Sequence, residues 1–230
     1  MADLVVVVPT RGRPQAAAEL AQAFADTSTS DTQLVFAVDA DDPERGGYTA
    51  LMHESHARCP YVIEQPNGTM VTALNLVALT AARDTFAVGF MGDDHRPRAV
   101  GWDRAYLDAL RELGTGIVYG NDLLQGQNLP TQCAMTSDII RTLGYMAPPT
   151  LQHMYVDNAW LALGTELGRI RYLPDVVVEH LHPIAGKAEW DDGYRRVNDN
   201  AVYARDRAMF QAWLRESLPV EAARLRRIAR

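Results

Sequence analysis

The segment Phe86–Pro97, FAVGFMGDDHRP, sets the interpretation of the surrounding chain. It opens with an apolar run that continues to Met91 and then stops at a turn, which is typical of a strand buried on both faces. Helical patterns lie on either side, at Met70–Ala82 and Gly101–Leu113. The segment therefore predicts a central strand of an α/β sheet.

Two acids and a histidine follow this strand: Asp93, Asp94 and His95. Ligands of open α/β sheets bind at the carboxyl ends of the strands, which is where these residues fall. Adjacent carboxylates repel each other unless a cation or hydrogen-bond donors lie between them, and Mg²⁺ and Mn²⁺ prefer carboxylate ligands. The alternative is a solvated acidic turn that caps the next helix.

The composition describes a globular chain of 230 residues, 47% hydrophobic and 22% charged. Its formal net charge of −7 argues against nonspecific nucleic-acid binding, which needs a basic face. Of the two cysteines, Cys59 and Cys133, the second lies in a strand-like segment, which indicates a buried thiol. The apolar stretch Leu4–Val8 is too short for a signal peptide, and no window suits a membrane span. We expect a cytoplasmic protein.

The first strand, Leu4–Val8, runs into a basic loop, PTRGRP, and a helix predicted from Pro14 to Ala25. This loop offers the hydroxyl of Thr10 and the guanidinium groups of Arg11 and Arg13. A basic loop between a strand and a helix N-terminus suits phosphate binding, although the spacing matches neither a Walker loop nor a dinucleotide fingerprint. Exposed arginines without a ligand are the alternative.

Acids also end the second strand, Gln33–Val38. We assign a functional role to Asp39, which ends the strand directly, and a cap or surface role to Asp41 and Asp42. In the helix that starts near Thr69, Asn75 lies off the apolar stripe, where it either contacts a ligand or is solvated.

Later in the chain, Asp157 stands where a helix should start, so it is either a helix cap or a functional acid. Two short strands are predicted at 170–173 and 176–178, and the second leads into His180 and His182. Residues two apart on a strand point to the same side. One of these histidines is expected to complete a metal site with the acids at 93 and 94.

Two final segments follow: a lid at 184–190 that contains Lys187, and a long helix at 191–215. An arginine-rich tail ends the chain, as a solvated helix end or a contact for an acidic partner. We predict an α/β domain over 1–183, with a mostly parallel central sheet flanked by helices, and a lid with a helical extension over 184–230.

The order of these motifs resembles that of GT-A glycosyltransferases, most closely family-2-like enzymes, including members encoded by phages and bacteria. The resemblance covers about residues 4–183 and depends on Pro-Thr-Arg-Gly-Arg-Pro, Val-Asp-Ala-Asp-Asp and Met-Gly-Asp-Asp-His, in that order. It implies a Rossmann-like nucleotide-sugar-binding fold and an Mn²⁺ or Mg²⁺ ion. For a phage-encoded member, the location would be the host cytoplasm.

The resemblance also implies roles for individual residues. Asp94 and one of His180 and His182 would bind the metal, and Asp157 would be the general base of an inverting enzyme. Gly92 stands where the family's Asp-x-Asp motif has its first acid. The residues expected at the donor nucleotide sugar are Pro9, Thr10, Arg11, Arg13, Asp39, Asn75, Gly92, Asp93 and Lys187.

The resulting hypothesis is metal-dependent transfer of a sugar from a nucleotide diphosphate sugar to an acceptor hydroxyl. The acceptor is open: a protein, a glycan, a lipid-linked precursor or modified DNA. The C-terminal region would cover the acceptor or form a homodimer contact. A nucleotidyltransferase is a second hypothesis, although it would carry a glycine-rich loop with a lysine where this chain has Arg11-Gly12-Arg13. A nucleotide-sugar-binding module without activity is a third, favoured by Gly92.

Overall fold

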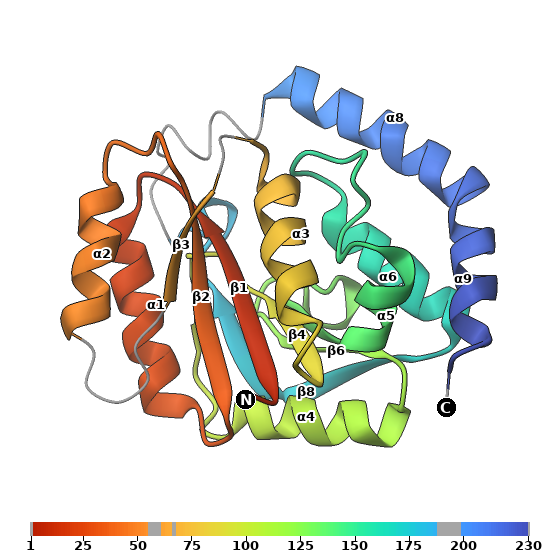
Figure 1. Ribbon diagram of the computed structural model, residues 1–230, viewed down its shortest axis with the longest axis horizontal. Coiled ribbons are helices and arrows are strands. Elements are labelled where there is room, and N and C mark those ends of the chain that lie inside the picture. Colours follow the sequence, from red (N-terminus) through yellow and green to blue (C-terminus); the bar gives the residue numbers. More distant parts are fainter. Residues whose placement is uncertain (1, 55–60, 66–67, 188–198, 230) are drawn as a thin grey trace.

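A computed structural model describes residues 2–54, 61–65, 68–187 and 199–229 (Figure 1). Eight strands of the described residues form one sheet in the order β3-β2-β1-β4-β7-β6-β8-β5. They are β1 (Leu4–Thr10), β2 (Thr32–Asp39), β3 (Tyr61–Gln65), β4 (Ala87–Phe90), β5 (His95–Pro97), β6 (Ile117–Asn121), β7 (Cys133–Thr136) and β8 (Ile170–His180). Only β5 and β7 run against the other strands. The predicted mostly parallel α/β sheet is therefore confirmed.

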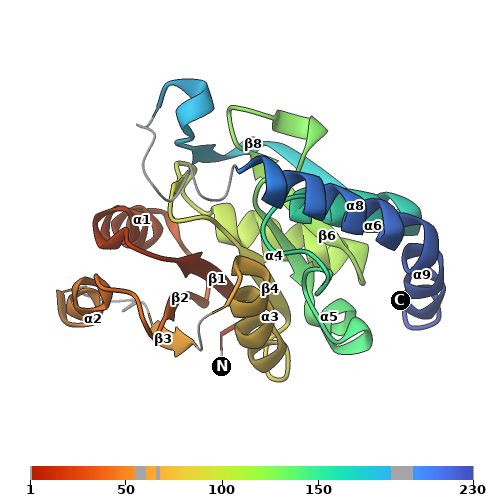
Figure 2. The same ribbon diagram turned by 90° about the horizontal axis from the view of Figure 1, so that it is seen from above.

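Helices cover both faces of this sheet (Figures 1 and 2). They are α1 (Pro14–Thr27), α2 (Arg45–Glu54), α3 (Met70–Ala81), α4 (Trp102–Leu113), α5 (Ser137–Leu143), α6 (Val156–Leu167), α8 (Asn200–Glu216) and α9 (Leu218–Arg226), with short 3₁₀ turns at Gly126–Asn128 and Pro183–Ala185. Residues of α1, α2 and α4 pack into the core on one face, and those of α3, α5, α6, α8 and α9 into the core on the other. No described helix is long and apolar enough to cross a membrane.

The side chains of β1 explain why its sequence is an unbroken apolar run. Val5 and Val7 belong to one core, and Leu4, Val6 and Val8 belong to the other. Successive side chains of a strand point to opposite faces, so a strand covered on both sides needs apolar residues at every position. The same reasoning correctly predicts β4.

One prediction about the later strands is wrong, and one strand was not predicted. Residues 170–173 and 176–178 form one strand, β8, because its pairing with β6 shifts register between the pairs Gly120–Leu173 and Asn121–Val177 and then resumes. In addition, the sequence analysis missed β5, which pairs antiparallel with β8 and places His95 opposite His180. A strand of three residues is too short to show a period.

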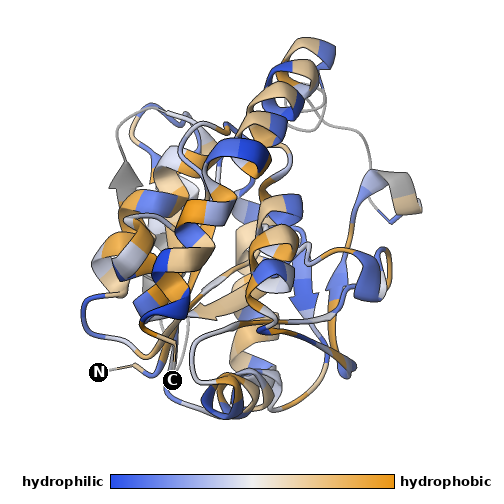
Figure 3. Ribbon diagram, turned by 90° about the vertical axis from the view of Figure 1, so that its right-hand side faces the viewer, coloured by the Kyte–Doolittle hydropathy of each residue, from blue (hydrophilic) through white to orange (hydrophobic). Residues whose placement is uncertain are grey.

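The C-terminal helices pack on the same core as α6. Helix α8 begins at Asn200 after the capping residue Asp199, and residues 191–198 of the predicted helix lie outside the described ranges. Phe210, Trp213, Leu218 and Leu225 are buried in this core. Figure 3, which faces this side, shows hydrophilic and hydrophobic residues mixed along the helices, as expected of amphipathic helices. A domain boundary at residue 183 stays a prediction.

Part of the arginine-rich tail is helical and is paired within the chain. Arg224 donates to the carbonyl of Thr142 and Arg226 pairs with Glu166, so these two arginines stabilise the docking of α9. Whether the tail also contacts an acidic partner stays a prediction.

Asp103 lies fully buried in the first turn of α4. Its hydrogen bonds join that helix to the connection between α1 and β2. Its carboxylate accepts the amide hydrogens of Thr29 and Ser30, at 3.0 and 2.9 Å, and the hydroxyl hydrogen of Thr32 at 2.8 Å. Each of these donors would lose its partner if the carboxylate were removed.

We predict that Asp103→Ala lowers the free energy of unfolding by about 3 kcal/mol, because several buried donors lose a charged acceptor. Asp108→Ala is the matched control, since Asp108 lies on the same helix with its side chain 57% exposed. It should change stability by less than about 0.5 kcal/mol. Urea unfolding followed by circular dichroism measures both. Equal losses for the two variants would refute this assignment.

Candidate active site

The loop after β1 holds the first of the two adjacent acids. The Thr10 hydroxyl donates to Oδ2 of Asp93 at 2.6 Å, and Nη1 of Arg13 lies 3.3 Å from Oδ1. Tyr48 accepts the Arg13 amide hydrogen at 2.7 Å and lies 3.2 Å from the Thr10 hydroxyl, which fixes the loop. Burial, followed by the charge of Asp94, raises the pKa of Asp93 to about 6. Asp93 and the predicted phosphate-binding loop therefore form one unit.

The acids after β2 hold the same loop from its other side. Nη1 of Arg11 lies 3.0 Å from Oδ2 of Asp39 and also pairs with Asp41. Asp42 is 2% exposed and accepts the amide hydrogen of Gly12 at 2.8 Å. The surface alternative for Asp42 is thus wrong, because its carboxylate satisfies a loop amide that the sheet leaves unpaired. The cap alternative agrees with the amide hydrogen of Glu44, just before α2, which Oδ1 of Asp42 accepts at 2.8 Å.

Asp94 lies between two histidines from neighbouring strands. Its Oδ2 is 3.3 Å from Nε2 of His180, and its Oδ1 is 3.3 Å from Nδ1 of His95. One ligand atom from each of the three residues lies within 4.8 Å of the others. Burial alone would raise the pKa of Asp94, but the interaction with His180, the largest opposing influence, helps to hold the pKa well below its usual range.

The two histidine rings are not equivalent. They stack 4.2 Å apart, and Nδ1 of His95 accepts the amide hydrogen of Gly92 at 3.0 Å. Burial lowers the pKa of His95, so the neutral ring carries its hydrogen on Nε2, which is buried with no hydrogen-bond partner in the described chain. Asp94 and His180 are therefore the ligands that this geometry favours.

The fit of a divalent ion can be judged from this pair. Ligands about 2.1 Å from one small ion lie about 3 Å from each other, close to the separation of Asp94 and His180. A carboxylate oxygen with an imidazole nitrogen suits a first-row divalent ion such as Mn²⁺. These residues fit the ion that the sequence analysis expects, and their role as its ligands stays a prediction.

Gly92 has a steric explanation. A Cβ atom at this position would lie 2.5 Å from Oδ1 of Asp94 and 3.1 Å from Nδ1 of His95. Any larger residue, including the acid of an Asp-x-Asp motif, would therefore displace the Asp94 carboxylate. The departure from that motif follows from the placement of Asp94 and His95, so it does not by itself indicate an inactive site.

Two further residues surround His180. Its ring lies 5.1 Å from that of His182, which follows the end of β8 rather than belonging to the strand. Nδ1 of His180 is 4.0 Å from Oδ2 of Asp122, a buried carboxylate that also accepts the Thr131 hydroxyl hydrogen at 2.7 Å. The sequence analysis did not select Asp122, although it follows β6 just as Asp94 follows β4.

Asp157 lies in the first turn of α6, where Tyr155 is the capping residue, with a φ of 65°. The Asp157 carboxylate accepts the amide hydrogen of Asn158 at 2.8 Å, so Asp157 is not the helix cap. Burial raises its pKa to about 6, while the charge of His180 lowers it and that of Asp122 raises it. The role of Asp157 as a general base stays a prediction.

Three residues that were predicted to contact the nucleotide sugar make structural contacts within the chain. The Asn75 amide joins α3 to residues 146–147, accepting two backbone amide hydrogens at 2.9 Å and donating to a carbonyl at 2.8 Å. Lys187 pairs with Glu179 at 2.8 Å, and Glu179 precedes His180 on β8 and so faces the other side of that strand. Pro9 lies within β1, opposite Ala37. A donor contact by any of them stays a prediction.

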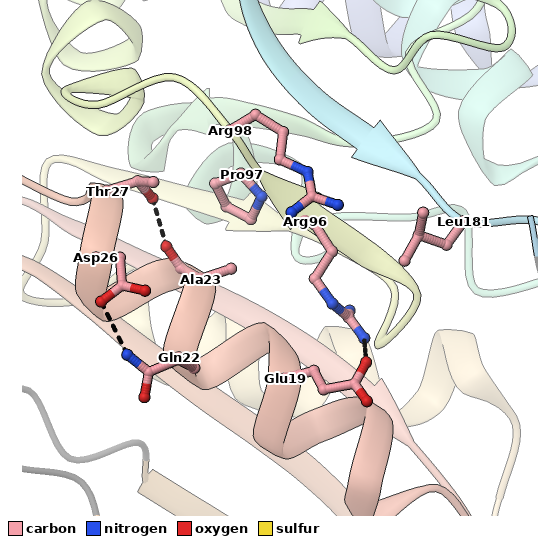
Figure 4. Close-up of a pocket in the computed structure, with 9 residues that line it drawn as sticks. All are labelled: Glu19, Gln22, Ala23, Asp26, Thr27, Arg96, Pro97, Arg98 and Leu181. Carbon is pink, nitrogen blue, oxygen red and sulfur yellow. Dashed lines mark hydrogen bonds and ion pairs between the residues drawn. The ribbon is translucent and has the colours of Figure 1, made fainter.

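A separate hollow of about 510 Å³ lies between α1, β5 and the end of β8. Figure 4 shows Arg96 reaching across it from β5 to Glu19 on α1, with Nη2 2.8 Å from Oε2. None of the predicted site residues lines this hollow.

The fold is shared with solved glycosyltransferase structures. S. aureus TarS 1–349 in complex with UDP matches with a TM-score of 0.60 and 15% identity, covering 77% of this chain and 59% of that chain. A mannosyltransferase from Pyrobaculum calidifontis, in complex with GDP-Man and Mn²⁺, matches with a TM-score of 0.62 and 14% identity, covering 96% and 72%. TarS 1–349 with UDP-GlcNAc gives 0.61 at 14%, covering 92% and 72%.

At these identities the likeness defines the fold, which is GT-A-like. No family model matches the sequence, and no curated protein matches it. The activity is therefore inferred from the site residues of this chain, taken together with the fold.

We predict that Asp94→Asn and His180→Ala each weaken Mn²⁺ binding by about 10- to 100-fold or more. Loss of a residue that only supports a metal ligand typically costs about 10- to 100-fold in affinity, and loss of a ligand should cost no less. Glu179→Gln is the control, because it removes a carboxylate next to His180 that pairs with Arg98 and Lys187 instead. Titration of Mn²⁺ followed by electron paramagnetic resonance measures all three. Unchanged binding in both site variants would exclude this pair as the ligands.

Proposed function

We propose that this chain is a metal-dependent, inverting glycosyltransferase that uses a nucleotide diphosphate sugar. The observation that carries the proposal is the Asp94–His180 pair. It lies at the carboxyl end of a GT-A-like sheet, beside a loop that contains Arg13. Asp157, a half-buried acid with a raised pKa, lies in the first turn of α6. The donor-bound relatives of the same fold support this assignment.

The donor would bind over the ends of β1, β2 and β4. Asp39, which is held by Arg11, would accept hydrogen bonds from the base or ribose. Arg13 would contact the diphosphate, and the contact of Thr10 with Asp93 supports the loop that carries it. Asp94 and His180 would hold a divalent cation, which would supply positive charge against the diphosphate leaving group.

Asp157 would act as the general base. In an inverting transfer the acceptor oxygen forms a bond to the anomeric carbon while the bond from that carbon to the diphosphate oxygen breaks. The acceptor proton passes to Asp157, and the electron pair of the broken bond leaves with the diphosphate. A carboxylate with a pKa of about 6 is mostly ionised at neutral pH and is a stronger base than an ordinary aspartate.

The first test is calorimetric titration with UDP, GDP, CDP and TDP, each with and without Mn²⁺, on the unaltered chain and on Asp94→Ala. We expect one nucleotide to bind, and to lose about tenfold or more in affinity without Mn²⁺ or without Asp94, because that carboxylate would hold an ion whose positive charge favours the diphosphate. A folded protein that binds none of the four would refute the donor site.

Removal of the base should lower turnover without weakening donor binding. For Asp157→Asn we expect kcat to fall by about 10²- to 10⁴-fold. In the unaltered enzyme kcat should fall as the pH drops through about 6, because burial raises the pKa of Asp157 and only the ionised form accepts a proton. The assay is release of nucleoside diphosphate from the matching nucleotide sugar.

Asp138→Asn is the matched control, since Asp138 lies in the first turn of α5 and accepts the amide hydrogen of the next residue at 2.9 Å, as Asp157 does. Its kcat and pH profile should stay within about twofold of those of the unaltered enzyme. If the kcat of Asp157→Asn still fell as the pH dropped through about 6, another group would be the base.

A further inference from the structure

Helix α8 holds the segment that leads into α6. The Asp206 side chain, fully buried, points its carboxylate at three consecutive backbone amides. Its Oδ2 accepts the amide hydrogens of Gln152, His153 and Met154 at 3.1, 2.9 and 2.9 Å. The Gln152 carbonyl in turn accepts the amide hydrogen of Val71 on α3 at 3.2 Å. The order of residues 152–154 therefore depends on Asp206 for its amides and on α3 for the Gln152 carbonyl.

Aromatic rings of the same helix hold the next residue. The Tyr155 ring stacks on Phe210, with centroids 5.4 Å apart and an angle of 21°, and contacts Tyr203 at 5.2 Å. Tyr155 has a φ of 65°, which is unusual for a bulky residue and persists only where its surroundings enforce it. The contacts from α8 provide that enforcement.

Asp157 follows two residues later, in the first turn of α6. The conformation of residues 152–155 sets the direction in which α6 begins, and therefore the place of the Asp157 carboxylate. A displacement of about 1 Å in a reacting group costs up to about 10²-fold in rate. The contacts of α8 thus bear on the candidate base although α8 is more than forty residues away in the sequence.

We propose that Asp206 is a positioning residue for the reaction, which fixes residues 152–155 and through them the carboxylate of Asp157. Its catalytic consequence rests on the proposed function, whereas the structural coupling between Asp206 and Asp157 does not. The coupling can therefore be tested without any substrate.

Arg205 provides a matched control. Its Nη1 lies 2.7 Å from Oδ1 of Asp206, whereas Oδ2 makes the closer contacts to the three amides. Arg205→Gln removes the ion pair and leaves those amide bonds in place. Asp206→Asn keeps an acceptor oxygen but loses the charge, and charge-assisted hydrogen bonds are about twice as strong as neutral ones. Asp206→Ala removes the acceptor altogether.

The experiment is a pH titration of the Asp157 carboxyl carbon by ¹³C nuclear magnetic resonance, with amide hydrogen exchange at residues 152–154, in these three variants. Titratable groups near Asp157 include His180, Asp122, Cys133 and Tyr155, and all four are unaltered. In Asp206→Ala we expect the three amides to exchange about tenfold faster or more. We also expect the Asp157 midpoint to move down from about 6, because a displaced carboxylate gains water.

Asp206→Asn should give changes in the same direction but smaller, and Arg205→Gln should give neither change. If Asp206→Ala does not fold, the comparison of Asp206→Asn with Arg205→Gln decides. The proposal is supported if amide exchange is faster and the Asp157 midpoint shifts in Asp206→Asn but not in Arg205→Gln. It is overturned if the Asp157 midpoint does not move in Asp206→Asn.

Turnover separates positioning from general damage. In Asp206→Ala, or in Asp206→Asn if the first variant does not fold, we expect kcat to fall by about 10- to 100-fold with an unchanged Kd for the nucleoside diphosphate and Mn²⁺. A parallel loss of nucleotide binding would overturn the proposal. If the midpoint moves but the unaltered chain turns over no nucleotide sugar, the positioning contact stands and the proposed function fails.

Discussion

Two carboxylates that are adjacent in the chain, Asp93 and Asp94, are largely removed from water at the end of β4, and the site is arranged around their repulsion. Asp93 points to the loop after β1, where Thr10 and Arg13 contact it. Asp94 points to the histidines of β5 and β8. Opposite orientations separate the charges and give each carboxylate its own partners. The short strand β5 is part of this solution, because it is the pairing of β5 with β8 that places His95 opposite His180.

The same arrangement distinguishes the two arginines of the first loop. Arg11 is shared between Asp39 and Asp41, so a phosphate would have to compete with two carboxylates for its guanidinium group. Arg13 lies 3.3 Å from Asp93, which also accepts the hydrogen of the Thr10 hydroxyl. The contacts of Arg11 indicate that it orients Asp39, and Arg13 stays the predicted contact for the diphosphate. An acidic protein can thus present local positive charge to an anionic donor.

The sequence predicts the features that depend on neighbours along the chain. The runs of β1 and β4, the apolar face of α4 and the acids that end strands all follow from local patterns. Features created by distant contacts are not predictable in this way. Asp42 and Asp122 look like surface acids until the loops that they hold are placed beside them, and β5 is defined only by its partner β8. The sequence shows that His95 follows the strand β4, but the bond that it accepts from Gly92 and its stacking on His180 depend on the fold.

The two halves of the site are ordered by different means. The donor side rests on parallel strands, whose ladders fix the ends of β1, β2 and β4 directly. The segment 146–155, which carries the chain to Asp157, contains Pro148 and Pro149 and belongs to no strand or helix. Its backbone amides are instead satisfied by side chains, by Asn75 at residues 146–147 and by Asp206 at residues 152–154. Buried amides need acceptors, and in a sheet the carbonyls of a neighbouring strand supply them. In this segment the side chains of Asn75 and Asp206 supply them instead. Helix α8 therefore belongs to the architecture of the half of the candidate site that carries Asp157, because Asp206 anchors the amides of residues 152–154.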